Sequence, residues 1–205
     1  MAELTVESTS KGANAPPSSR DRILAASVQV ALRDGVSAMT LDAVAREAGV
    51  SKGGLLYHFS SKDELIAAML QHHASRIQQT VEGRMAADPN PRGRWFRALV
   101  HTIHGYDEED PLVAEMPRFL IAMLAASATN PRLLDPIRER LKAVREHLLE
   151  EGPNGLRQVA LWPAIFGLML WRHLGVLSDD DPARRAIIEE LLGLAEGPDP
   201  SKSQE

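Results

Sequence analysis

Residues 39–65 of this chain read MTLDAVAREAGVSKGGLLYHFSSKDEL, which predicts two short helices joined by a turn and followed at once by a third helix. Thr40 can cap the first helix and Ser51 the second, because their hydroxyls accept hydrogen bonds from free amides of a first helical turn. Gly49 stands between them, where a turn residue with positive φ is needed. This order is that of a helix-turn-helix, whose second helix lies in the major groove of DNA.

The run from Gly49 to Gly53, followed by an aromatic cluster at 57–59 and by Lys62, resembles the signature of the TetR family of transcriptional regulators. These residues at fixed offsets are more specific than a helix-turn-helix pattern alone. The resemblance covers residues 20–65, and beyond them only the chain length and a helical pattern agree. The residues that carry it are Thr40, Val44, Ala45, Ala48, Gly49, Val50, Ser51, Gly53, Leu55, Tyr57, His58, Phe59, Ser61, Lys62 and Leu65.

Apolar residues recur at helical spacing along most of the chain, and no alternating run of β-branched residues predicts a strand. We therefore expect an all-α fold, in which a three-helix DNA-binding head precedes a larger helical body for ligand binding and dimerisation. The expected parts are a disordered arm at 1–19, the helix-turn-helix domain at 20–62, the helical ligand-binding and dimerisation domain at 63–196 and a flexible tail at 197–205. The helices expected after the motif run to about 85, then over 92–106, 112–128, 132–151, 156–177 and 182–195.

The distribution of charge is more informative than the net charge of −5 over 205 residues. Residues 20–62 hold six basic and four acidic side chains, which leaves a net charge of −7 for the rest of the chain. A mildly basic head on an acidic body suits contact with DNA at one end only. The chain has no cysteine, no secretory signal and no apolar run longer than residues 159–171, so we expect a cytoplasmic protein without disulfides or a membrane span.

Contacts to DNA divide into those to phosphates, which position the protein, and those to base edges, which specify sequence. We expect base readout to rest on Lys52, with Leu55 or Leu56, together with DNA shape. The full set of expected DNA-binding residues is Thr40, Ser51, Lys52, Gly53, Gly54, Leu56, Tyr57, His58 and Lys62.

The resemblance implies that Thr40, Tyr57 and Lys62 contact the DNA backbone. A second interpretation of the aromatic cluster is a core that fastens the following helix to the head. We favour the core for Phe59 and DNA for Tyr57, and the pattern leaves both open for His58.

Two positions depart from the family pattern. Leu56 stands where a second tyrosine is common, and it can touch a thymine methyl but cannot donate to a phosphate. Gly54 stands where threonine or alanine is usual. With Gly53 it lowers helix stability by about 1 kcal/mol per glycine relative to alanine, and the pair permits close approach of the backbone to DNA.

A single short helix reads only a few base pairs, so specific affinity requires a homodimer whose recognition helices lie about 34–36 Å apart. The run 159–171 is apolar on all sides, which is typical of a helix buried on all sides. The resemblance implies that the last two helices form a four-helix dimer bundle, although an ordinary intramolecular core is the alternative. The expected interface residues are Trp162, Phe166, Leu170, Ile188 and Leu192.

The resemblance places an inducer pocket among the middle helices, which here carry aromatic and methionine side chains suited to an adaptable apolar site. The same residues at helical spacing also fit plain core. His101, His104 and Tyr106 are the expected polar anchors. The expected pocket residues are Trp95, Leu99, Ile103, Tyr106, Met116, Phe119, Leu120 and Met123.

His101 and His104 lie three residues apart on one helix face, a spacing that can hold a metal, but zinc requires three or four converging ligands and no third is evident. We expect no metal and no cofactor. A glycine-rich phosphate loop, a Glu-x-x-His pair and a nucleophile elbow are also missing from the sequence, which argues against an enzyme.

These patterns predict a ligand-responsive transcriptional regulator, most simply a repressor. We expect its partners to be double-stranded DNA bound at a palindromic operator, a second copy of the chain and a largely apolar small-molecule inducer, with no membrane. An inducer in the body would shift the fourth helix and so change the distance between the two heads. Activation in place of repression stays open. The alternatives are a helical binding protein or enzyme whose helix-turn-helix is only a packing motif, and a membrane-surface protein, which the acidic body disfavours.

Overall fold

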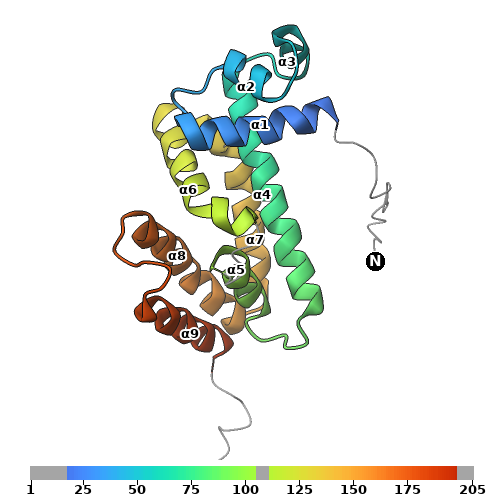
Figure 1. Cartoon of the computed structure of the whole chain (residues 1–205). Coiled ribbons are helices and arrows are strands. Elements are labelled where there is room, and N and C mark those ends of the chain that lie inside the picture. The colour runs from blue at the N-terminus through green and yellow to red at the C-terminus, as the bar shows by residue number, and fades with distance from the viewer. Residues whose placement is uncertain (1–17, 105–110, 198–205) are drawn as a thin grey trace, which may run out of the picture.

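The computed structural model describes residues 18–104 and 111–197, and for residues 111–118 the backbone alone. The described chain is helical and contains no strand, which confirms the all-α prediction. Figure 1 shows the head of α1 to α3 at one end of the molecule and α8 and α9 toward the other. The elements are α1 (Ser19–Asp34), α2 (Leu41–Glu47), α3 (Lys52–His58), α4 (Lys62–Ala87), α5 (Arg94–His104), α6 (Pro111–Thr129), the 3-10 helix η1 (Pro131–Leu134), α7 (Asp135–Glu150), α8 (Pro153–His173) and α9 (Pro182–Glu196).

The three helices of the head share one core, to which each contributes an apolar face. Ile23, Leu24 and Val30 of α1 are at most 1% exposed, as are Val44 of α2 and Leu55 of α3. Burying one such side chain contributes about 1.5–3 kcal/mol. This core therefore fixes α2 and α3 relative to α1. The outer face of α3 stays exposed to solvent and can contact another molecule.

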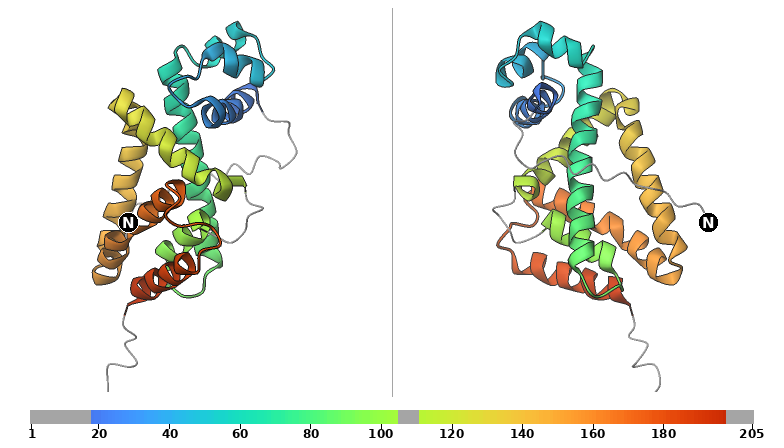
Figure 2. Two further views of the ribbon diagram at one scale, coloured as in Figure 1. Left: turned by 60° about the vertical axis from the view of Figure 1, so that its left-hand side comes forward. Right: turned by 90° about the vertical axis from the view of Figure 1, so that its right-hand side faces the viewer.

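Helix α4 is a single helix of 26 residues that belongs to both halves of the molecule. Near its start, Leu65 and Met69 are buried in the core of the head. Near its end, Val81 and Met85 pack in the core of the body. Figure 2 shows α4 running unbroken from the head along the body. At 1.5 Å per residue it spans about 39 Å, so it connects the two cores rigidly.

The body has its own core, formed mainly by α5, α8 and α9. Phe96, Ile103, Ile165, Met169 and Ile188 are each at most 4% exposed there. Helices α6 and α7 pack against both α4 and α8. One side of the second half of α4 is thus covered by α5, α6 and α7.

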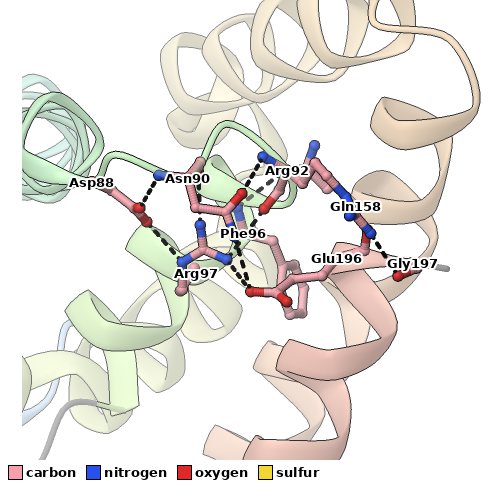
Figure 3. A network of polar contacts seen from close by, with 8 residues as sticks. All are labelled: Asp88, Asn90, Arg92, Phe96, Arg97, Gln158, Glu196 and Gly197. Carbon is pink, nitrogen blue, oxygen red and sulfur yellow. Dashed lines mark hydrogen bonds and ion pairs between the residues drawn. The ribbon is translucent and has the colours of Figure 1, made fainter. Parts of the chain in front are cut away.

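A polar network ties the loop between α4 and α5 to the end of α9 (Figure 3). The guanidinium of Arg97 donates to Asp88 Oδ2 and to Glu196 Oε1, both at 2.7 Å. Arg92 Nη2 donates to the backbone carbonyl oxygens of Glu196 at 3.0 Å and Gly197 at 2.9 Å. Because these bonds join segments about a hundred residues apart in sequence, they fix α9 against the start of α5.

Several predicted helix boundaries differ from the observed ones by a few residues; the helix expected to end at 177, for example, ends at His173. The helix expected over 132–151 is divided into η1 and α7, and α8 begins at Pro153 instead of residue 156. Proline suits the first turn of a helix because its missing amide has no partner there anyway, and Gly152, with φ of 70°, makes the turn before it. Tyr106, the expected end of the fifth helix, lies outside the described residues. No helix within the described ranges is both long and apolar enough to cross a bilayer.

Candidate DNA-binding head and ligand cavity

The turn between α2 and α3 is built by the residues that the sequence singled out. Thr40 Oγ1 accepts a hydrogen bond from the Ala43 amide at 3.1 Å, and Ser51 Oγ accepts one from the Gly54 amide at 3.0 Å. Gly49 has φ of 65°, in the left-handed region that favours glycine. Both predicted caps are thereby confirmed, and the hydroxyls of Thr40 and Ser51 are engaged with their own helices.

The outer face of α3 presents the bulky side chain of Tyr57, whereas the first turn of this helix carries two glycines. Tyr57 is 87% exposed and Leu56 is 40% exposed, whereas Leu55 and Phe59 are at most 1% exposed. Phe59 therefore belongs to the core, as favoured, and Leu55 is too deeply buried to read a base. His58 is half-buried, and its ring lies 5.2 Å from that of Tyr57, centroid to centroid.

Two lysines of the head are held in place by acceptors. Lys52 Nζ lies 2.9 Å from Asp42 Oδ2, and both side chains are more than half exposed. Lys62 Nζ donates to the carbonyl oxygen of Ser37 at 2.7 Å. An exposed ion pair contributes about 0–1 kcal/mol, so exchanging Asp42 for a phosphate or a base would cost Lys52 little.

The adjacent glycines at the start of α3 differ in their surroundings. A Cβ built on Gly53 meets no atom of the chain within 4 Å, whereas one on Gly54 would lie 3.3 Å from Ser51 Oγ. Gly53 is exposed. The chain's own packing thus gives no reason for glycine at position 53.

The body contains a partly open cavity of about 450 Å³ between α4, α5, α6, α7 and α8. Its walls are mainly apolar, as in most small-molecule sites. Tyr106 and the side chain of Met116 lie outside the described residues. Of the eight predicted pocket residues, six line this cavity, namely Trp95, Leu99, Ile103, Phe119, Leu120 and Met123.

Sequence reasoning missed the contribution of α7 to this cavity. Ile137, Leu141, Val144 and Leu148 line it, and they recur at the three- and four-residue spacing of one helix face. That spacing was the available signal. The spacing indicates a buried face of a charged amphipathic helix but does not show that this face lines a cavity.

Four of the five residues predicted for the dimer interface are buried or half-buried within the chain itself. Trp162 and Phe166 line the cavity, and the ring of Trp162 packs edge-to-face on Trp95 with centroids 4.7 Å apart. Ile188 is 4% exposed in the body core, and Leu192 is half-buried against the same core. Only Leu170, at 37%, is exposed. A helix that is apolar on every side gives no indication of which face meets its own domain.

Other apolar side chains of α8 and α9 are exposed instead. Trp171 and Leu194 are each 47% exposed, and Leu174, directly after α8, is 63% exposed. Leu170, Trp171 and Leu174 recur at the spacing of one helix face and form an apolar surface that this chain does not cover. Leu194 lies apart from them, three residues before Gly197, which packs on Arg157 near the start of α8. Exposed apolar clusters of this kind are typical of protein–protein contacts.

Polar groups line the cavity only at a few points. Glu82 Oε1 accepts a hydrogen bond from Gln78 Nε2 at 2.6 Å, and Arg140 Nη1 donates to Ser75 Oγ at 2.9 Å. Glu151 Oε2 accepts a hydrogen bond from Gln158 Nε2 at 3.2 Å. All of these but Ser75 and Gln158 line the cavity, as does His147.

Gln158 connects the cavity wall to the start of α5. This side chain is 1% exposed. Its Oε1 accepts a hydrogen bond from the Phe96 amide at 3.1 Å, while its Nε2 donates to Glu151. The bridge holds the carboxylate of Glu151 close to the end of α5 that carries Trp95.

Phe119 lies between the cavity and the head. It lines the main cavity and also a small hollow formed with α1 residues Val28, Ala31 and Leu32. Its ring lies 3.9 Å from the ring of His73 on α4, centroid to centroid. Burial, with a smaller contribution from the positive charge of Arg76, lowers the pKa of His73 to about 4. The ring against Phe119 is thus neutral at physiological pH.

The histidines predicted as polar anchors do not line the cavity. His104 is 2% exposed, and its Nε2 lies 3.0 Å from the Ile165 carbonyl oxygen, to which it donates. Burial lowers the pKa of His104 to about 4. His101 is exposed at the surface. In the described part of the chain, no three histidine or acidic side chains converge as a metal site requires.

Two family models match the chain: bacterial regulatory proteins, tetR family, over residues 23–69, and a tetracyclin repressor-like C-terminal domain over residues 93–196. The HTH-type transcriptional regulator SrpR of Pseudomonas putida is 42% identical over 81 residues, which are 40% of this chain and 36% of SrpR. The HTH-type transcriptional activator FasR of Mycolicibacterium smegmatis is 36% identical over 91 residues, which are 44% of this chain and 41% of FasR. The matches therefore span about two fifths of these relatives.

A solved structure resembles the chain over a greater length. The multidrug binding protein EbrR, complexed with malachite green, superimposes with a TM-score of 0.65 at 23% identity, over 87% of this chain and 98% of EbrR. At this identity the likeness is one of fold.

Proposed function

The chain belongs to the TetR family of transcriptional regulators, and on this premise we propose that it is a ligand-responsive repressor. In this proposal a homodimer covers a palindromic operator, and a largely apolar small molecule in the body cavity releases it. The family is one of DNA-binding regulators and not of enzymes.

The observation that carries the proposal is the continuity of α4. The same helix buries Leu65 in the core of the head and presents Ile77, Val81 and Met85 to the cavity. A ligand that tilts the second half of α4 must also move the head. For a dimer on a fixed palindrome, even a small change in the distance between two heads weakens binding, since half-site spacing is set by the DNA.

Phe119 supports the same route by a second contact. It is part of the cavity wall, its ring packs on that of His73 on α4, and it lines a small hollow together with three residues of α1. A ligand that displaces the Phe119 ring therefore also shifts α1 of the head. Ligand and DNA then favour different positions of the head, and each weakens binding of the other by the same factor.

The dimer contact in this proposal is the exposed apolar surface of Leu170, Trp171 and Leu174. It replaces the interface expected from the sequence, of which it keeps Leu170. The DNA contacts proposed are those of the exposed α3 face, with Lys52 and Leu56 at bases and Tyr57 at a phosphate. Lys62, together with the start of α4, is proposed to hold a second phosphate.

The experiment that tests the proposal is selection of genomic fragments by the purified full-length chain at physiological salt, followed by sequencing. We expect one enriched palindrome whose half-sites lie about one helical turn apart or a multiple of it. An enriched site that overlaps a promoter supports repression. A site upstream of it, as an activator requires, would replace repression by activation.

Absence of any enriched sequence, with and without candidate ligands, would contradict the proposal. It would favour a helical binding protein that uses the cavity alone. The Lys52→Ala variant sharpens the assignment of contacts. A base contact predicts relaxed sequence preference, whereas equal weakening on all sequences would make Lys52 a phosphate contact.

A further inference from the structure

We propose that the cavity takes a planar aromatic cation, which binds at the end formed by Trp95, Trp162, Glu82 and Glu151. This inference rests on the proposed function in treating the cavity as a ligand site, and it adds the chemical class of the ligand. The charged side chains of the cavity wall, with their hydrogen-bond and ion-pair partners, support it.

The two carboxylates of the cavity keep their negative charge available. Glu82 is hydrogen-bonded to the amide of Gln78, and Glu151 to the amides of Asn154 and Gln158. An amide orients a carboxylate but does not neutralise it. Across the described chain no lysine or arginine forms an ion pair with either group.

The basic side chains of the cavity, Arg140 and His147, are engaged elsewhere. Arg140 donates to Ser75 Oγ on α4, and it lies eleven residues, or about 16 Å, before Glu151 along α7. His147 Nδ1 lies 3.7 Å from Glu150, which is not part of the wall. The cavity therefore has a negative end and, about three helical turns away, a single guanidinium.

Aromatic rings occupy the negative end. Trp95 and Trp162 meet edge-to-face, and Phe166 belongs to the same wall. The face of an indole ring carries partial negative charge and attracts cations within about 6 Å. Gln158 fixes the Glu151 carboxylate next to the start of α5, where Trp95 is carried. In this proposal a flat cation lies against these rings, and the exposed carboxylates of Glu82 and Glu151 attract it from the rim of the cavity.

A volume of about 450 Å³ admits a ring system of three fused rings. Acridine compounds provide a matched series at neutral pH: 9-aminoacridine is a cation, acridine is neutral and acridine-9-carboxylate is an anion. Their binding to the full-length chain, without DNA, is measured by fluorescence or calorimetry. We expect the cation to bind at least tenfold more tightly than the neutral compound, and the anion most weakly.

The double variant Glu82→Gln and Glu151→Gln removes both charges but keeps the hydrogen-bonding shape of the side chains. We expect its affinity for 9-aminoacridine to fall about tenfold, which corresponds to about 1.4 kcal/mol, with acridine unaffected. The matched control is Glu139→Gln with Glu146→Gln, which changes net charge equally on exposed parts of α7 outside the wall. It should bind both compounds as the unaltered chain does.

Three results would overturn this inference. They are equal binding of cation and neutral compound, tightest binding of the anion with loss in Arg140→Gln, and no binding of any acridine. None of them bears on operator recognition, which is measured on DNA alone. Charge-selective acridine binding by a chain that enriches no DNA sequence would leave this inference standing and contradict the proposed function.

Discussion

The substitution Gly53→Ala at the start of α3 should change the folding stability of the protein and its affinity for DNA in opposite directions. In the folded chain a methyl group at this position meets nothing within 4 Å, and Gly53 has no positive φ. Alanine is favoured over glycine in helices by about 0.5–1 kcal/mol. For a chain of 205 residues, 1 kcal/mol raises Tm by about 2–4 °C. The variant should therefore be slightly more stable than the unaltered chain.

On DNA the same methyl group should be harmful. Gly53 is an exposed position in the first turn of the proposed recognition helix. If the backbone approaches the DNA closely there, the added carbon must push the helix outward, once in each head of the dimer. We expect operator affinity to fall at least tenfold, or about 1.4 kcal/mol. The assays are thermal unfolding by circular dichroism and fluorescence anisotropy on the recovered operator.

Gly83→Ala is the matched control for this substitution. Gly83 is an exposed glycine inside α4, far from the head, and a Cβ there also meets nothing within 4 Å. Gly83→Ala should raise Tm by a similar amount and leave operator affinity unchanged. Unchanged operator affinity in Gly53→Ala would refute the close-approach argument. A lower Tm in either variant would refute the account of the local structure.

Three further predictions concern the body. Phe119→Leu should keep ligand affinity within a few-fold but reduce the effect of the ligand on operator affinity, and an undiminished effect would exclude this ring from the coupling. Because burial depresses the pKa values of His73 and His104 to about 4 in the fold, against 6.5 when unfolded, stability should be complete above pH 6.5 and fall as the pH drops toward 4. The loss is about 3 kcal/mol for each histidine, and urea unfolding of His73→Leu should show a flatter pH profile than the unaltered chain. Leu174→Glu should convert the dimer to a folded monomer in sedimentation velocity, and a variant that stays dimeric would place the interface elsewhere.

The head could be predicted from sequence almost completely because its determinants are local. Thr40, Gly49 and Ser51 each act on residues within one helical turn, so their roles follow from spacing. Spacing alone could not show which of Leu55 and Leu56 is buried and which is exposed. The distinction depends on how α3 is rotated against α1, which is set by packing between helices.

The body was less predictable because its arrangement depends on contacts between distant segments. Phe119 and Trp95 were recognised as pocket residues, although nothing near them in sequence indicates that α7 closes the cavity. Trp162 was assigned to the dimer interface because α8 is apolar on all sides, and only the position of Trp95 shows that it faces inward. The buried bridge of Gln158 to Phe96 spans 62 residues and leaves no local trace.

The central claim is that two heads read one palindrome. It is tested most directly by titrating the chain against the recovered operator, a single half-site and a scrambled sequence of the same composition at fixed physiological salt. We expect two protomers on the operator and an affinity at least about 10³-fold higher than on the scrambled DNA, with the half-site far weaker than the operator. Equal affinity for all three DNAs would contradict it.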